Sequence, residues 1–205
     1  WYIDCNMPYE DGTQTQKVRP HNAVAIATDT GRPNSDGSIS EGYDSWYNSM
    51  STIYEKGLKP HFRWLDAGWY LDPYKKTVPT DWWGTVGSWA LDKEKWPSDS
   101  LKECSDYCLA RGTKTFMWFE PERVTHLDGM AKNYGYEKNW ALSDPSDDRC
   151  YVNDLGNAAC REWLLGRIIG VLEENDISMY REDFNVDPSA YWIFGDEREG
   201  ADRTG

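Results

Sequence analysis

The sequence predicts an α/β fold with parallel strands, the arrangement shared by the doubly wound sheet and the (β/α)8 or TIM barrel. Short apolar segments alternate with longer amphipathic segments, and several of the short segments end in carboxylates. Four or five strands can be identified in the 205 residues, whereas a complete barrel takes about 250 residues.

The first elements follow from local composition. The beginning of the chain is rich in Asp, Gly, Pro and Asn, which predicts loops around one apolar strand at residues 22–28. Residues 43–57 carry apolar side chains at helical spacing and close with Gly57, a residue that tolerates the left-handed end of a helix. Residues 61–66 then alternate as a strand.

The pattern continues along the rest of the chain. Residues 98–112 predict a second helix, and residues 114–122 a strand that Pro121 helps to end. Residues 157–175 predict a third helix, and residues 177–183 the strand after it.

Two further segments complete the prediction. Residues 150–154 read as another strand of the same sheet. Residues 195–205 are polar and rich in Gly, which is typical of a loop before the next helix.

Composition excludes some classes of partner. Hydrophobic residues make up 39% of the chain and aromatic residues 15%, enough for a sizeable core, and the formal net charge is −13. This charge repels polyphosphate and anionic lipid, so neither nucleic acid nor a membrane is an expected partner. No segment approaches the about 20 apolar residues of a spanning helix, and the start of the chain shows no signal-peptide pattern.

The five cysteines are an odd number, and their spacings match no zinc site. Cys104 and Cys108 are four residues apart, which places both on one helix face as small buried residues. A reducing, cytoplasmic location in a bacterium is favoured, and a secreted form stays open because the chain begins at Trp1.

Only three widely separated histidines are present, so no metal or other cofactor is expected.

Carboxylates stand at the ends of several predicted strands, where parallel architectures place their chemistry. These residues are Asp66, Glu120, Glu122, Asp154 and Asp183. Asp154 is more typical of a loop or helix cap, and Glu122 of a structural residue. Asp183 is the functional candidate, because Arg181 and Asn185 share its face of the strand and favour an ionised carboxylate.

Tryptophan rings are expected near the same strand ends. Buried Trp packs any core, yet flat apolar rings beside carboxylates also suit a sugar, with its apolar faces and hydroxyl edges. The residues concerned are Trp64, Trp69, Trp82, Trp83, Trp89 and Trp118.

Five segments, in order and at matching spacing, resemble the catalytic barrel of family 36 of the glycoside hydrolases, the bacterial α-galactosidase family. They are WLDAGWY (64–70), GSWALDKEKWPSDSLKECSDYCLARGTKTFMWFEPERV (87–124), NWALSD (139–144), YVNDLGNAACREWL (151–164) and YREDFN (180–185). The resemblance implies a (β/α)8 or TIM barrel, of which the N-terminal half or slightly more is present. Residues 41–205 are expected to form this partial barrel, and residues 1–40 the barrel entrance or a link from a preceding domain. The resemblance further implies a retaining exo-glycosidase that hydrolyses terminal α-D-galactosides of the melibiose and raffinose type through a covalent glycosyl-enzyme.

The resemblance also implies roles for the residues of the YREDFN strand. Asp183 matches the nucleophile that attacks the anomeric carbon. Arg181 stands where many members have Lys, so a cation that orients the sugar is retained with a different hydrogen-bond geometry. Asn185 matches an Asn near the sugar hydroxyls.

Three more substrate-binding residues are implied by the same resemblance. Asp66 matches the first of two adjacent acids that grip the 4- and 6-hydroxyls of galactose, and the second position here is Ala67. Trp118 matches the platform residue of WFEPE. Arg149, upstream of YVNDLGN, matches a sugar-contacting Arg.

The acid/base carboxylate comes from a later strand in the family, so it is expected beyond Gly205. Glu182 points to the opposite side of its strand and Asp187 lies in the following loop, so neither is assigned this role. The chain alone is therefore expected to be inactive.

Alternatives stay open at this point. The same family resemblance allows an α-N-acetylgalactosaminidase or a transglycosylase, and the rings with Asp66 would also serve a non-catalytic carbohydrate-binding domain. A metal-dependent hydrolase of the same fold would lose activity in EDTA. The expected partner is an α-galactoside oligosaccharide, and a homo-oligomeric full-length protein is compatible with the sequence.

Overall fold

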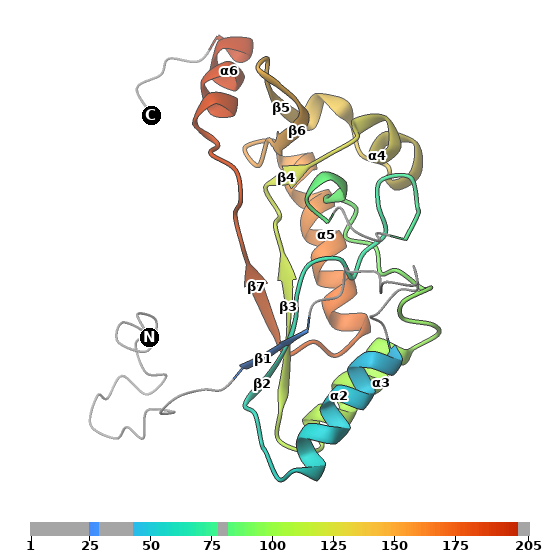
Figure 1. The fold of residues 1–205 in the computed structure, drawn as a ribbon. Coiled ribbons are helices and arrows are strands. Elements are labelled where there is room, and N and C mark those ends of the chain that lie inside the picture. The colour runs from blue at the N-terminus through green and yellow to red at the C-terminus, as the bar shows by residue number, and fades with distance from the viewer. Residues whose placement is uncertain (1–24, 29–42, 78–81, 201–205) are drawn as a thin grey trace, which may run out of the picture.

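Figure 1 shows the fold in a computed structural model that describes residues 25–28, 43–77 and 82–200. The segment 1–40, expected to be a barrel entrance or a linking segment, lies outside the described residues except for one strand. The described chain contains a parallel sheet, helices along one side of it, and a smaller antiparallel sheet beyond the ends of its strands.

The parallel sheet has the strand order β1-β2-β3-β7. Its register pairs Leu65 with Met117 and Trp118 with Arg181. Each neighbouring pair of strands is parallel, so their carboxyl ends all lie at one edge. The strands are β1 (Ala25–Thr28), β2 (Phe62–Leu65), β3 (Lys114–Phe119) and β7 (Met179–Glu182).

Three helices connect these strands, as the sequence predicts. They are α2 (Tyr43–Glu55), α3 (Ser100–Leu109) and α5 (Ala158–Glu174). Gly57 and Gly112 follow two of them with φ of 77° and 80°, a left-handed conformation that glycine adopts without a Cβ clash. The predicted alternation of parallel strands and helices is confirmed, and a closed barrel remains a prediction.

An antiparallel sheet of order β4-β6-β5 interrupts the alternation between β3 and α5. Residues 150–154 therefore belong to this second sheet and its edge, and their placement in the parallel sheet was wrong. The cause is a turn at Pro145 and Ser146, where the Ser146 amide and hydroxyl both donate to Asp144 Oδ1 and the chain reverses into a hairpin. Its elements are β4 (Arg123–Val124), α4 (Leu127–Tyr134), η2 (Lys138–Trp140), β5 (Ala141–Asp144) and β6 (Asp147–Asn153).

The last described element is the helix α6 (Ser189–Glu199). The loop predicted from residue 195 onward is therefore wrong for its first part, and residues 201–205 lie outside the described residues. The cause is tertiary packing. Tyr191 of α6 is buried against Leu142 and Val152 of the antiparallel sheet, and this contact anchors a helix that continues through the polar residues 196–199 at its C-terminal end.

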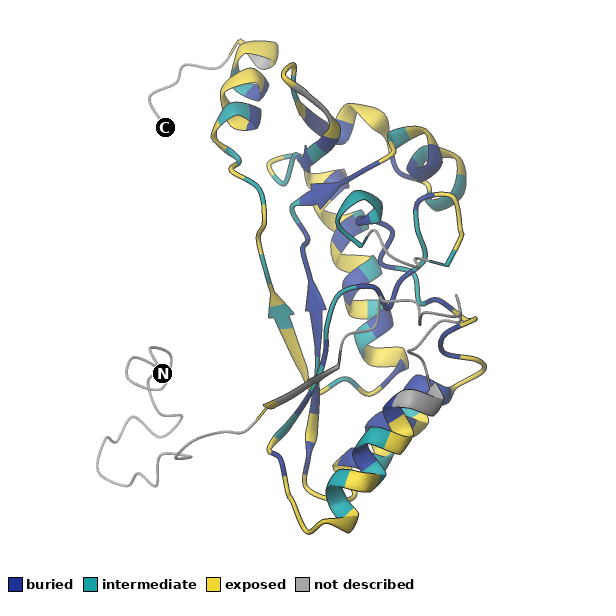
Figure 2. Ribbon diagram, viewed as in Figure 1, coloured by how far each residue is buried: buried dark blue, intermediate teal, exposed yellow. Residues whose placement is uncertain are grey.

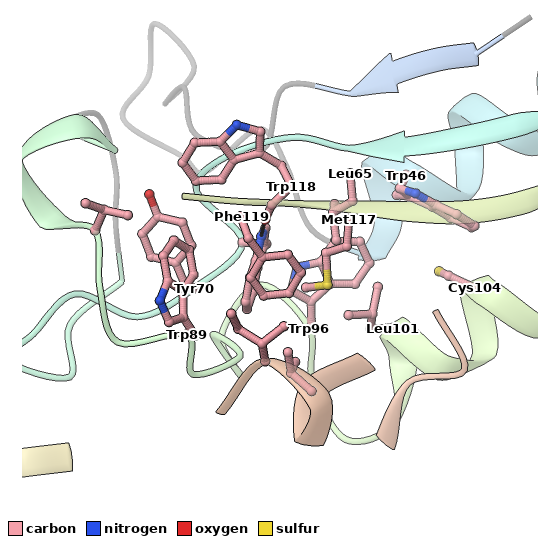
Figure 3. Packing of buried hydrophobic residues seen from close by; sticks show 14 of the residues in the cluster. Trp46, Leu65, Tyr70, Trp89, Trp96, Leu101, Cys104, Met117, Trp118 and Phe119 are labelled. Atoms are coloured by element: carbon pink, nitrogen blue, oxygen red, sulfur yellow. Dashed lines mark hydrogen bonds between the residues drawn. The ribbon is translucent and has the colours of Figure 1, made fainter. Parts of the chain in front are cut away.

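The main core lies between the parallel sheet and its helices. Figure 2 shows β3 as a largely buried strand beside the more exposed β7. Met117 points from β3 toward Leu101 of α3 in the close view of Figure 3, and Cys104 and Cys108 of the same helix are buried free thiols, as expected. None of the helices in the described ranges is long and apolar enough to cross a membrane.

Candidate active site

Asp183 lies directly after β7 and is held by two hydrogen bonds and one ion pair. Trp118 Nε1 donates to Asp183 Oδ2 at 2.9 Å, and the Phe184 amide donates to Oδ1 at 3.0 Å. Arg181 Nη1 lies 3.4 Å from Oδ2, an ion-pair contact rather than a hydrogen bond. Partial burial raises the pKa of this carboxyl, but the two hydrogen bonds and the Arg181 charge outweigh burial, so the pKa of Asp183 is below its ordinary value.

The register of β3 and β7 explains this arrangement. Trp118 pairs with Arg181, so their side chains share one face of the sheet, and the Asp183 amide extends the ladder by donating to the Phe119 carbonyl at 2.8 Å. The guanidinium of Arg181 lies 4.5 Å from the ring centroid of Trp64 on β2, which fixes the cation over an aromatic face. Asp183 is therefore positioned by strands distant from it in sequence.

A second anchor holds the residues that follow Asp183. The Asn185 amide donates to Glu120 Oε1 at 2.8 Å, and Glu120 Oε2 lies 2.6 Å from Arg123 Nη2. Both of these charged side chains are 0% exposed. Arg123 also donates to the Trp83 carbonyl and stacks 4.3 Å over its ring. Glu120 is thus a buried structural anchor of the site, a role that the spacing Glu-x-x-Arg in FEPER could have suggested.

Asp66 lies at the same edge of the sheet as Asp183. It follows β2 directly, is half-buried, and accepts the Ala67 amide at 2.9 Å through Oδ1. Strand β3 lies between β2 and β7, so Asp66 and Asp183 flank the end of β3. Arg149 lies apart from this group, on β6, where it lines a cavity together with Trp83.

The tryptophan rings divide between packing and exposure. Trp69 and Trp89 belong to the core, and Trp118 is only 1% exposed, so its ring offers no open face to a sugar in this structure. Its indole N–H instead holds Asp183. Trp82 and Trp83 are half-buried, and the Trp82 ring meets Trp118 edge-on at 5.5 Å.

Glu122 and Glu182 form a separate acidic pair. Glu182 pairs with Phe119 in the register and accepts the Tyr180 hydroxyl at 2.8 Å, so it faces away from Asp183, as expected. Burial raises the pKa of Glu122 to about 7, and the neighbouring negative charge of Glu182 adds to the shift. This pair lies on the helix side of the sheet, with Tyr180 and Glu182 lining an apolar groove along α5.

We expect Glu122→Gln to remove a pH dependence of stability. The folded pKa of about 7 lies above the ordinary 4.5, so the folded state keeps a proton that the unfolded chain releases. The stability contributed by this group is fully present below pH 4.5 and is lost as the pH rises through 7. When the free energy of unfolding is measured by urea titration at several pH values from 4.5 to 7, that of the wild type should fall with rising pH relative to that of the variant. Parallel curves for the two proteins, with Glu174→Gln as an exposed control, would contradict this assignment.

Comparison with known proteins agrees with the resemblance to family 36 seen in the sequence. No family model matches the sequence. The α-galactosidase Mel36A of Lactobacillus acidophilus is 25% identical over 150 residues, which cover 70% of this chain and 19% of that protein. A family 36 α-galactosidase, the AgaA variant from Geobacillus stearothermophilus in complex with stachyose, superimposes with a TM-score of 0.56 at 17% identity, over 86% of this chain and 25% of that one. The resemblance to family 36 is confirmed.

The match to family 36 concerns only part of a longer architecture. The chain spans about one fifth of the length of Mel36A. An α-amylase from Geobacillus thermoleovorans, complexed with acarbose, also superimposes with a TM-score of 0.59 at 16% identity, over 88% of this chain and 44% of that one. This second likeness, like that to AgaA, concerns the fold, whereas the sequence match is to an α-galactosidase of family 36.

Proposed function

We propose that this chain is part of the catalytic barrel of a retaining α-galactosidase, with Asp183 as nucleophile. The observation that carries the proposal is the pair of hydrogen bonds and the ion pair on Asp183 at the carboxyl edge of a parallel sheet. A carboxylate held ionised at that edge is suited to attack an anomeric carbon. The similarity to Mel36A supports galactose as the sugar, and the stachyose complex of AgaA supports an oligosaccharide substrate.

In the proposed reaction, an Asp183 oxygen bonds to the anomeric carbon while the glycosidic C–O bond breaks. The leaving oxygen takes a proton from a second carboxylic acid, which we expect beyond Gly205. That carboxylate then removes a proton from water, which attacks the anomeric carbon and releases Asp183. The hydrogen bonds from Trp118 and the Phe184 backbone amide, together with the charge of Arg181, keep Asp183 ionised. Asp66, Arg149 and Asn185 are proposed substrate contacts.

The stereochemistry of the product tests this function directly. The full-length protein should hydrolyse an aryl α-galactoside, and proton NMR at early times should show the α-anomer of galactose, because two inversions at one carbon give net retention. An initial β-anomer would contradict the covalent mechanism, and absence of hydrolysis would contradict the proposed activity.

A second test concerns recognition by Asp66. Removing a charged partner of a sugar hydroxyl costs about 1.5–3 kcal/mol, so we expect Asp66→Ala to lower kcat/KM for an aryl galactoside by roughly ten- to a hundredfold. For an analogue that lacks the hydroxyl concerned, the loss should nearly vanish. Steady-state kinetics on the galactoside and on its 4- and 6-deoxy analogues measures the difference. Equal losses on all substrates would make Asp66 a structural residue.

A further inference from the structure

A cavity of ≈ 720 Å³ lies between η1 (Trp83–Thr85), the start of α4 and strand β6. Its volume is within the range of small-molecule sites. Figure 1 shows α4 and β6 on the side of the molecule toward which β3 and β7 end. Its lining includes Tyr74, Trp83, His126, Lys138, Arg149 and Tyr151.

Two sets of contacts connect the cavity to Asp183. Trp83 lines the cavity, whereas its neighbour Trp82 packs edge-on against Trp118, the donor to Asp183. The ring of Trp83 also carries the Arg123 guanidinium, whose partner Glu120 accepts the Asn185 amide. The cavity is therefore connected to Asp183 by two routes. One runs through the adjacent residues Trp82 and Trp83, and the other through the buried Glu120–Arg123 ion pair.

The lining has the chemistry of a saccharide site. Tyr74 is 47% exposed and His126 is also exposed, and the centroids of their rings lie 5.4 Å apart, so two accessible aromatic residues stand side by side in the cavity lining. Lys138 is ion-paired with Asp128, which neutralises its charge. Aromatic faces beside hydroxyl groups and an ion pair suit a ligand that has apolar faces and hydroxyl edges.

We propose that this cavity binds the leaving-group sugars of an oligosaccharide whose terminal galactosyl residue is attacked by Asp183. The proposal rests on the proposed function and adds the location of the leaving group. The proposal also specifies the role of Arg149. Because Arg149 lines this cavity with Trp83, it contacts the sugars on the leaving-group side of the cleaved bond.

The test compares a short with a long substrate in the full-length protein. Tyr74→Ala removes one exposed ring. His126→Asn removes the other and keeps a residue that accepts the left-handed backbone conformation observed at φ 49°. Each change should lower kcat/KM about tenfold for a tetrasaccharide ending in an α-galactosyl unit, and by less than about twofold for an aryl α-galactoside. Tyr47→Ala, an aromatic of similar exposure on α2, should affect neither substrate.

The outcomes separate this proposal from the proposed function. Equal losses on both substrates, or no loss on the tetrasaccharide, would overturn the cavity assignment while leaving hydrolysis intact. If the wild type hydrolyses neither substrate, the proposed function fails, and titration with the tetrasaccharide followed by NMR decides about the cavity. Binding that Tyr74→Ala weakens would still support a sugar site there, whereas unchanged binding or no binding would overturn it.

Discussion

Asp183→Gly is expected to lower the turnover of an activated aryl α-galactoside by on the order of 10⁴-fold or more, the loss that follows removal of a nucleophile. The full-length protein should keep its fold, because the Asp183 side chain is partly exposed. Removing the carboxylate leaves a space beside the anomeric carbon. Added azide should enter it and release the aryl group as a β-galactosyl azide, with inverted configuration.

The matched control for this variant is Asp187→Asn. Asp187 is an exposed carboxylate four residues further along, and its Oδ1 accepts the Ser189 amide and hydroxyl, which an Asn oxygen can also do. This variant should retain activity near that of the wild type, whereas Asp183→Asn should be as inactive as Asp183→Gly. Wild-type turnover in Asp183→Gly without azide would assign the nucleophile elsewhere.

Glu120→Ala is expected to destabilise the protein by about 3–5 kcal/mol, because it leaves the Arg123 guanidinium buried without its carboxylate. The same change removes the acceptor of the Asn185 amide, so the segment after Asp183 loses its anchor. Chemical unfolding followed by circular dichroism measures the first effect. Amide hydrogen exchange at Asn185 should accelerate and reports the second.

Two further variants separate the loss of the Asn185 hydrogen bond from the loss of an ion pair, and a buried ion pair from an exposed one. Glu120→Gln keeps an oxygen for the Asn185 amide and should slow that exchange relative to Glu120→Ala, although Arg123 still lacks a negative partner. Asp128→Ala breaks an ion pair between exposed side chains, with Lys138, and should leave the unfolding midpoint nearly unchanged. A loss below about 1 kcal/mol in Glu120→Ala would show that the buried pair is not a structural anchor.

The sequence alone determined the local elements of the fold. The two-residue period of residues 61–66 and 177–183 and the helical spacing of residues 98–112 and 157–175 depend on neighbours within one segment, so each is readable without knowledge of the rest. The position of Asp183 at a strand end between Arg181 and Asn185 follows from the same short-range pattern. These features predicted the parallel α/β arrangement and the candidate nucleophile.

The tertiary structure decided which groups meet. Trp118 reaches Asp183 across 65 residues of sequence, and Glu120 reaches the Asn185 amide across the same separation, because both contacts depend on the register of β3 against β7. Burial on the helix side of that sheet likewise raises the pKa of Glu122, which its sequence position does not indicate. Residues 150–154 pair within the hairpin of β5 and β6, and not within the parallel sheet where the sequence pattern had placed them. Pairing between distant segments is settled by the free energy of the whole packed chain, so local periodicity carries little information about it.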